Sequence, residues 1–171
     1  MLTQLLLLDE KLFRRIEGLR APPVVRAMRA LTHLGDAPGW FAIGLFLLAS
    51  SGAVARSGLL LGTAAVLATL VSQVLKRACC RPRPSIGLPG FVAIVENPDR
   101  FSFPSGHSAA AFAVAVALAG QGTALGPLAL TLACGIGVSR VYLGAHYPLD
   151  VAVGAALGGG CGVLARLFVL G

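Results

Sequence analysis

Charged residues are scarce in this chain, and their scarcity argues against a soluble domain. Only 12% of its 171 residues are Asp, Glu, Lys or Arg, whereas 56% are hydrophobic. Soluble domains carry about 25% charged and about 45–50% apolar residues. The length suits one domain, and in a bilayer it suits about five spans of ~20 residues joined by short loops. The sequence therefore predicts an all-α protein, a polytopic bundle of about five transmembrane helices.

Acidic residues are the rarer of the two charged kinds, which leaves a basic excess to explain. Seven Asp and Glu stand against 14 Lys and Arg, giving a formal net charge of +7. Nucleic acid is a poor partner for this charge, because no basic stretch is interleaved with aromatic side chains and most of the chain is apolar. The cations are better interpreted as anchors at the membrane surface and as parts of an anion pocket.

Cysteine occurs only four times, and its spacing indicates no metal site. Cys79, Cys80, Cys134 and Cys161 form neither a CxxC pair nor a Cys/His ligand pattern, which argues against zinc and against a disulfide framework. Cys134 and Cys161 are expected to be small buried residues. No cleavable signal peptide is expected, because the apolar residues 1–8 run directly into three charged residues.

Residues 1–35 are predicted to form an interfacial segment, and residues 36–171 a membrane-embedded domain. Leucine and isoleucine recur at every third or fourth position from Leu5 to Leu19, with charged residues between them. This pattern is typical of an amphipathic helix too charged to span. Residues 24–34 form a second, shorter amphipathic piece. Both pieces are expected at the membrane surface, or alternatively packed over the bundle as a lid.

Five apolar stretches follow, and each is predicted to cross the membrane. Their approximate bounds are 38–54, 59–75, 105–120, 124–142 and 148–170, with turns at 56–58 and 121–123 and a polar loop at 76–103. Five glycines crowd the last stretch, between positions 154 and 162, which suits close helix packing. Because successive spans reverse direction, the second span ends at the surface where the third begins, the fourth ends and the fifth begins.

Polar side chains gather on that one surface. Ser105 suits a helix cap after Pro104, so His107 falls in a first turn, where free backbone N–H groups favour an anion. Many cations and two histidines around a helix start describe a phosphate pocket. The residues of this surface are Lys76, Arg77, Arg81, Arg83, His107, Arg140, His146 and Asp150.

Two of these residues also have a simpler interpretation. Arg140 can extend from a helix end to the interface, although an isolated charge within an apolar span costs roughly 3 kcal/mol, which a bound anion would offset. Asp150, behind a Pro148 that suits a helix start, can cap that helix or reach back to His146 and orient its ring. The two roles of Asp150 are compatible.

Three motifs at these positions resemble the signature of the type 2 phosphatidic acid phosphatase superfamily, over about residues 36–170. They are Lys76-x6-Arg83-Pro84, Pro104-Ser105-Gly106-His107 and Ser139-Arg140-x5-His146-x3-Asp150. The resemblance implies a lipid phosphatase in which His146 attacks phosphorus to give a phosphohistidine, Asp150 orients His146, and His107 protonates the leaving oxygen. It implies that the non-bridging oxygens are held by Lys76, Arg83, Ser105, Gly106 and Arg140. Fixed cations would replace a metal, so no cofactor is expected and activity should not need Mg²⁺.

The resemblance also bears on substrate and location. It favours polyprenyl (undecaprenyl) diphosphate, with phosphatidic acid, phosphatidylglycerol phosphate and decaprenyl-phosphoryl sugar phosphates as alternatives. It places the site on the periplasmic face of the inner membrane, whereas the Lys and Arg count alone favours the cytoplasmic face. The rival classes are a haloperoxidase-like oxidant and a non-enzymatic lipid transporter. Membrane lipids are the expected surroundings, and a homo-oligomer is left open.

Other polar residues near this surface lie outside the motifs. Arg77 and Arg81 are expected to meet lipid headgroups or a second phosphate. Residues 96–100 are expected to form a solvated turn overhanging the pocket, and His33 to be interfacial and non-catalytic.

Overall fold

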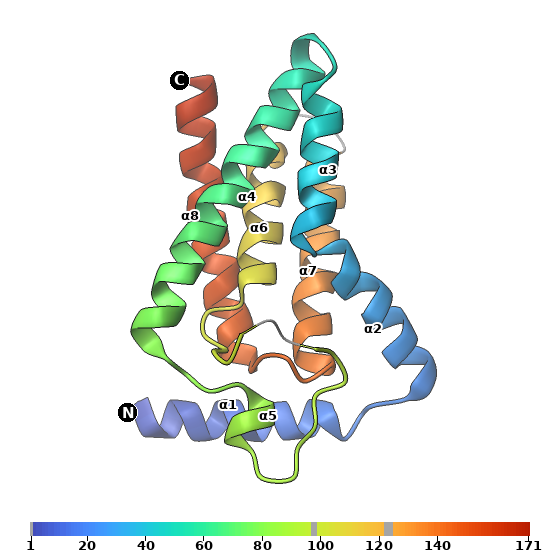
Figure 1. Cartoon of the computed structure of the whole chain (residues 1–171), viewed down its shortest axis with the longest axis vertical. Helices are drawn as coiled ribbons and strands as arrows, with labels where there is room; N and C mark the ends of the chain where they lie inside the picture. Colours follow the sequence, from blue (N-terminus) through green and yellow to red (C-terminus); the bar gives the residue numbers. More distant parts are fainter. Residues whose placement is uncertain (1, 97–98, 122–124) are drawn as a thin grey trace.

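The computed structural model describes residues 2–96, 99–121 and 125–171. In that part of the chain every regular element is a helix, as the composition predicts (Figure 1). The elements are α1 (Leu2–Glu17), α2 (Pro22–Leu34), α3 (Ala37–Leu48), α4 (Gly52–Cys79), α5 (Pro84–Gly87), α6 (Gly106–Ala119), α7 (Leu125–Tyr142) and α8 (Pro148–Leu170).

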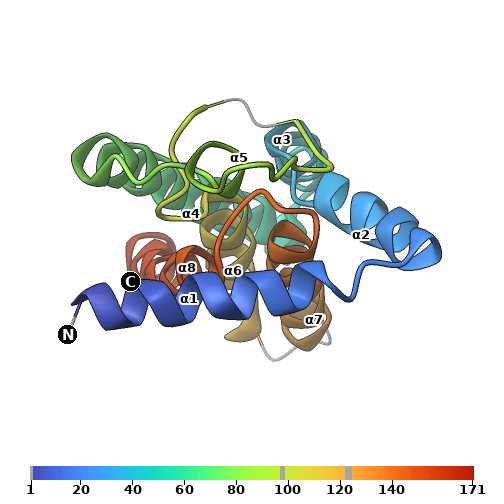
Figure 2. The ribbon, with the colours of Figure 1, turned by 90° about the horizontal axis from the view of Figure 1, so that it is seen from below.

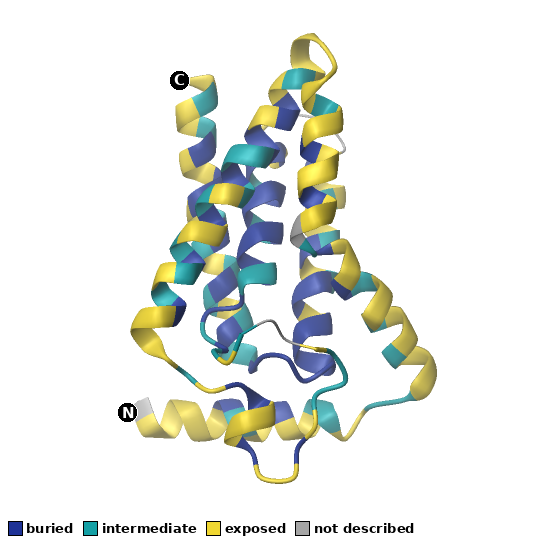
Figure 3. Ribbon diagram, viewed as in Figure 1, coloured by how far each residue is buried: buried dark blue, intermediate teal, exposed yellow. Residues whose placement is uncertain are grey.

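Helix α6 forms the centre of the bundle, and α4, α7 and α8 pack around it. Its residues are mostly Ala and Val and are mostly buried, because helices cover it on several sides (Figure 3). By length and composition α4, α7 and α8 can each cross a membrane. Helices α2 and α3 meet at 48° and together could form a fourth span. The remaining predicted span is α6, whose 14 residues extend only about 21 Å, less than the ~30 Å of a bilayer core.

Several predicted boundaries are wrong by part of a turn or more. The first apolar helix ends at Leu48, and the chain reverses at residues 50–51 instead of at 56–58. Gly52 adopts φ +59°, a left-handed value that favours glycine, so the Ser-Ser-Gly sequence makes the reversal. Arg56 lies inside α4, where its long side chain reaches out of the apolar helix. Helix α4 also continues through Lys76 to Cys79, so the predicted start of the polar loop at position 76 is wrong. Residues 122 and 123 of the other predicted turn lie outside the described residues.

The glycines of the last helix pack it against α6. A Cβ atom added at Gly154, Gly158 or Gly162 would lie 2.6, 2.2 or 2.5 Å from the main-chain oxygen of Ser105, Ala109 or Ala113, respectively. These glycines are four residues apart, so they form one stripe along α8. Only a residue without a side chain allows two helix backbones to approach this closely. We call this contact the α6–α8 seam.

Helix α1 lies across the end of the bundle where α4 and α7 finish and α6 and α8 begin (Figures 1 and 2). Its inward face carries Asp9 and Phe13, both buried. Its predicted apolar stripe faces away from the protein, with Leu5, Leu8 and Leu12 at least 45% exposed. Such an outward leucine face on a charged helix suits the surface of a membrane.

Cys134 and Cys161, which are both predicted to be buried, differ in their exposure to solvent. Cys161 is buried as predicted, whereas Cys134 is exposed on the outer side of α7, so the prediction for Cys134 is wrong. All four cysteines are free thiols.

Candidate active site

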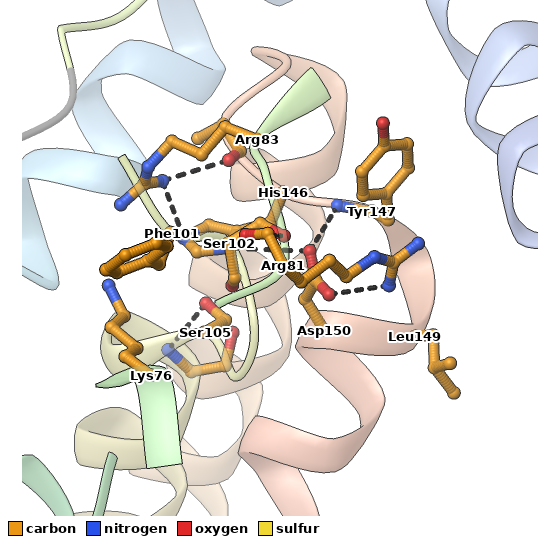
Figure 4. A network of polar contacts seen from close by, with 12 residues as sticks. Lys76, Arg81, Arg83, Phe101, Ser102, Ser105, His146, Tyr147, Leu149 and Asp150 are labelled. Carbon is orange, nitrogen blue, oxygen red and sulfur yellow. Dashed lines mark hydrogen bonds and ion pairs between the residues drawn. The ribbon is translucent and has the colours of Figure 1, made fainter. Parts of the chain in front are cut away.

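The three predicted motif segments meet at one end of the bundle, which we call the catalytic end (Figures 1 and 4). The alternating direction of the helices brings them together, as the order of the spans predicts. Six of the eight predicted site residues are buried there, namely Lys76, Arg83, Ser105, Arg140, His146 and Asp150. The side chain of His107 is 24% exposed, and Gly106 is the first residue of α6.

Lys76 and Arg83 both bind the carboxylate of Asp99. The Lys76 Nζ donates to Asp99 Oδ2 at 2.6 Å, and the Arg83 Nη2 donates to Asp99 Oδ1 at 2.8 Å. The Arg83 Nε also donates to the Asp99 carbonyl oxygen at 2.7 Å. The prediction of a solvated turn is therefore wrong at position 99. The Asp99 carboxylate is thus bound by Lys76 and Arg83, the two cations predicted to bind phosphate. This contact shows that the two side chains can hold one oxyanion together.

The ring of His146 is fixed by hydrogen bonds at both nitrogens. Its Nδ1 lies 2.7 Å from the main-chain oxygen of Ser102, and because a carbonyl only accepts, Nδ1 carries the proton. In the neutral ring Nε2 then has the lone pair. Arg83 Nη1 donates to Nε2 at 3.2 Å. The ring therefore presents Nε2 toward the cations.

Asp150 contacts His146 less closely than was expected. Its Oδ2 lies 3.7 Å from His146 Nδ1 and accepts a shorter bond, 2.8 Å, from the main-chain N–H of Tyr147. Its main-chain oxygen accepts from Ser105 N at 3.0 Å, which joins the first turn of α8 to the start of α6. Asp150 thus caps the start of α8, and the direct hydrogen-bond partner of the imidazole is Ser102.

Arg81 points into the protein. Its two terminal nitrogens each lie 2.7 Å from a buried carboxylate, Nη1 from Asp150 and Nη2 from Asp9. The expectation that Arg81 meets a lipid headgroup or a second phosphate is therefore wrong. No local pattern predicts this pairing, because Asp9 lies 72 residues away along the chain.

His107 is held by a residue that sequence reasoning missed. Its Nε2 lies 2.9 Å from Asp36 Oδ1, and the other oxygen of Asp36 lies 3.0 Å from Nδ1 of His33. The one signal in the sequence is the position of Asp36 immediately before the Ala37-Pro38 start of α3. Ser105 caps α6 as predicted, its Oγ accepting from the N–H of Ser108 at 3.4 Å.

Arg140, in the last turn of α7, is buried and donates from Nη1 to Thr32 Oγ1 of α2 at 2.6 Å. This burial argues against the simpler interpretation, in which the side chain of Arg140 extends to the interface. Its main-chain oxygen accepts from the N–H groups of Ala145 and His146 at 3.0 and 3.2 Å, which shapes the loop that carries the histidine.

The electrostatics of the catalytic end favour anions. Burial lowers the pKa of His146 well below its usual 6.5, and the positive charges of Arg140, Arg83 and Lys76 lower it further. Burial alone would raise the pKa of Asp99, but its bonds to Lys76 and Arg83 hold it below the usual value. At neutral pH the site therefore holds a neutral imidazole beside fixed positive charge.

A cavity of about 410 Å³ opens beside Arg83 and Asp99. Arg100 and Ser85 give it a polar side, and Ile86, Val92 and Val95 line the apolar side. No group of three or more His, Cys, Asp or Glu side chains that could hold a metal ion occurs among the described residues.

Comparison with known proteins agrees with these motifs. A family model described as the PAP2 superfamily matches residues 57–170. A decaprenylphosphoryl-5-phosphoribose phosphatase of Mycobacterium tuberculosis is 37% identical over 148 residues, which cover 84% of this chain and 79% of that protein.

Two solved structures are similar along nearly the whole chain. The crystal structure of LpxE from Aquifex aeolicus has a TM-score of 0.82 and 31% identity, covering 94% of this chain and 95% of that one. A transmembrane PAP2-type phosphatidylglycerolphosphate phosphatase from Bacillus subtilis has a TM-score of 0.80 and 29% identity, covering 96% and 86%.

Proposed function

The chain belongs to the PAP2 superfamily and is an integral-membrane lipid phosphatase, and on that premise we propose that it acts through a phosphohistidine at His146. The observation that carries the proposal is the neutral ring of His146, with Nδ1–H bound to Ser102 and the Nε2 lone pair facing Arg83, which together with Lys76 holds a carboxylate.

In the first step the Nε2 lone pair of His146 attacks phosphorus while the bond to the leaving oxygen breaks. His107 gives its proton to that oxygen, so the lipid alcohol or lipid phosphate leaves neutralised at the broken bond. In the second step His107 takes a proton from water, the water oxygen attacks phosphorus and the N–P bond breaks. Inorganic phosphate leaves, and both histidines return to their starting states.

The remaining predicted residues stabilise charge. Lys76, Arg83 and Arg140 hold the non-bridging oxygens, and the Ser105 hydroxyl and the Gly106 N–H complete the cradle. A Cβ atom at Gly106 would meet nothing within 4 Å, so the start of α6 is open to a ligand. The phosphate takes the place of the Asp99 carboxylate on Lys76 and Arg83. Asp36 holds His107 in position to donate.

For the substrate we propose a polyprenyl-phosphoryl sugar phosphate. The sequence alone favours polyprenyl diphosphate, but the relative matched over 84% of this chain has the sugar phosphate in its name. The cavity beside Arg83 and Asp99 supports this preference, because a sugar and a phosphodiester between the hydrolysed phosphate and the lipid would need polar space there. Assays of both lipids on one preparation compare the two, with a higher kcat/KM for the sugar phosphate expected.

The apolar surroundings of the site support a lipid-linked substrate at the membrane surface. We further propose that residues 1–35 lie at that interface, with α2 along the membrane surface instead of crossing it together with α3, and that the catalytic end faces outside the inner membrane. Cys79 and Cys80 are exposed near the end of α4 and report on this face. In spheroplasts an impermeant maleimide should label them, and the C79S/C80S double variant should lose that label. Labelling only after lysis would place the catalytic end in the cytoplasm.

The central experiment is phosphate release from a short-chain polyprenyl-phosphoryl sugar phosphate by detergent-purified protein. We expect His146→Ala to abolish release, because the attacking atom is gone. His33→Ala removes another histidine of the same end and should retain activity. Equal release by wild type and His146→Ala would refute the phosphohistidine mechanism. The expected intermediate is an acid-labile, base-stable phosphoenzyme that forms in the wild type and is absent from His146→Ala.

A further inference from the structure

The amino-terminal helix is connected to the nucleophile through one arginine. Arg81 lies between two carboxylates, donating from Nη1 to Asp150 Oδ1 and from Nη2 to Asp9 Oδ2, both at 2.7 Å. The side chains of Asp9 and Asp150 are 4% and 0% exposed, and that of Arg81 is 17% exposed. Buried ion pairs of this length hold their partners in one geometry, because water cannot replace either one.

Asp9 also binds the first turn of α8 directly. Its second carboxylate oxygen accepts from the main-chain N–H of Leu149 at 2.8 Å. One side chain of α1 therefore holds α8 at two adjacent points, Leu149 directly and Asp150 through Arg81. Asp150 in turn accepts a hydrogen bond from the main-chain N–H of Tyr147, the residue next to His146.

The guanidinium of Arg81 also contacts an aromatic ring, in addition to the two carboxylates. Its Cζ lies 4.1 Å from the ring centroid of Tyr147, a distance suited to a cation–π contact. Phe13 of α1 packs against the same ring in an edge-to-face arrangement, with the two ring centroids 5.4 Å apart. Asp9 and Phe13 are one helical turn apart, so one face of α1 supplies both contacts.

Arg81 does not belong to the phosphate-binding set. In Figure 4 Arg81 and Asp150 lie on one side of His146, and Lys76 and Arg83 lie on the other. Both terminal nitrogens of Arg81 are already directed at carboxylates. Its charge balances Asp150, a buried carboxylate whose other neighbours include the main-chain N–H of Tyr147, the side chain of Ser102 and, at 3.7 Å, Nδ1 of His146.

We propose that Asp9 and Arg81 are positioning residues, which hold Asp150 and the His146 loop in the geometry that phosphoryl transfer needs. This inference rests on the proposed role of His146. It gives α1 a place in catalysis: the helix that turns its leucines to the lipid surface also holds the first turn of α8. Neither residue touches the phosphate.

The test compares neighbouring carboxylates of α1. Asp9→Asn keeps the shape of the side chain and removes its charge, whereas Glu10→Gln removes the charge of a residue whose partner is the exposed Arg14. We expect Asp9→Asn to lower kcat about tenfold with KM nearly unchanged, as a small displacement of a reacting group does. Glu10→Gln should leave both constants at their wild-type values.

A double-mutant cycle separates positioning from general destabilisation. If Asp9 acts through Asp150, Asp9→Asn/Asp150→Asn should have the kcat of Asp150→Asn alone. If the two substitutions lower kcat independently, so that their separate effects multiply in the double variant, the proposal is wrong. It is also wrong if Asp9→Asn has the wild-type kcat, or if a rise in KM accounts for its whole loss of kcat/KM. Should Asp9→Asn not yield monodisperse protein, Arg81→Lys replaces it, because lysine keeps the charge but cannot bridge two carboxylates as guanidinium does.

The two hypotheses fail in different ways. If His146→Ala releases phosphate at the wild-type rate, the proposed mechanism is wrong. If His146→Ala is inactive and both Asp9→Asn and Arg81→Lys turn over at the wild-type rate, only the positioning role is wrong.

Discussion

The carboxylate of Asp99 accepts a hydrogen bond from Nζ of Lys76 at 2.6 Å, at the position where we propose that a phosphate oxygen binds. The same carboxylate bonds Arg83 at 2.8 Å. Both cations are buried, whereas the Asp99 side chain is 28% exposed. The more exposed partner is the one that can leave, so we expect a substrate phosphate to compete with Asp99 for the two cations.

Replacing Asp99 should therefore strengthen substrate binding. We expect Asp99→Asn to lower KM and the inhibition constant of inorganic phosphate by about fivefold, corresponding to the roughly 1 kcal/mol of a partly exposed ion pair. Steady-state kinetics with phosphate as competing inhibitor measure both constants. Glu96→Gln, in the same loop, is the matched control and should change neither. A higher KM in Asp99→Asn would mean that Asp99 holds the cations in place for the substrate.

The contact between His107 and Asp36 predicts a dependence on the leaving group. With an alkyl phosphate, His107→Ala should lose about 10²-fold or more in kcat, because the leaving alkoxide needs a proton. With p-nitrophenyl phosphate the loss should be much smaller, since nitrophenolate leaves without one. Asp36→Asn should show the same pattern at lower amplitude, and His33→Gln should not show it. Equal losses on both substrates would argue against a general-acid role.

The lowered pKa of His146 predicts the acid limb of the pH profile. Because the attacking ring must be neutral and its pKa lies well below 6.5, kcat/KM should stay level as pH falls to 6.5 and decline only below that value. Arg140→Gln removes one of the positive charges that lower this pKa, so its acid limb should move to higher pH. If the acid limb came instead from ionisation of the free substrate, it would lie at the same pH in the wild type and in Arg140→Gln. A wild-type limb at or above pH 6.5 would contradict a buried neutral nucleophile.

The three buried cations proposed to hold the phosphate, Lys76, Arg83 and Arg140, predict that catalysis needs no divalent metal. In the proposed mechanism they supply the positive charge that a metal gives in other phosphatases. Activity of the purified protein should therefore be unchanged by EDTA, and added Mg²⁺ should not raise it. Loss of activity in EDTA with recovery in Mg²⁺ would show that the fixed cations are insufficient.

The α6–α8 seam predicts a large effect from a single methyl group. Gly158→Ala would bring a Cβ atom to 2.2 Å from the oxygen of Ala109, so the helices must separate. We expect a loss of about 1–3 kcal/mol, seen as a lower unfolding temperature in detergent. Gly160→Ala on the same helix would meet nothing within 4 Å and should be neutral or slightly stabilising. Similar unfolding temperatures for Gly158→Ala and Gly160→Ala would contradict the close contact between α6 and α8.

The helical architecture could be predicted from the sequence because the lengths of the apolar runs, and the turns between them, depend on residues close together in the chain. Apolar runs of 12 residues or more marked α3, α6, α7 and α8, and their alternating directions placed His107 and His146 at one end. The predicted turn before α4 is misplaced because the charge of Arg56 suggests a loop, whereas Arg56 lies within the helix. An arginine near a helix start can reach past the apolar region, so its charge alone does not mark a turn.

The partners within the site could not be predicted, because choice of partner depends on distance in space. Arg81 and Arg83 are the same residue type two positions apart, yet one bonds Asp9 and Asp150 and the other Asp99. The carbonyl of Ser102 that orients His146 is a main-chain group present at every position, so no residue type signals it. Asp36 and Thr32 come from the segment before the motifs and meet His107 and Arg140 only after the chain folds.

The α6–α8 seam starts at Ser105, beside the first turn that carries His107, and α8 starts directly after the loop of His146. Main-chain atoms in contact therefore help to set the spacing between the proposed proton donor and the proposed nucleophile. A bilayer that becomes thicker, thinner or more curved will tilt or bend the outer helices before it separates these two. The enzyme should therefore keep a nearly constant turnover across lipid mixtures that alter its affinity for substrate.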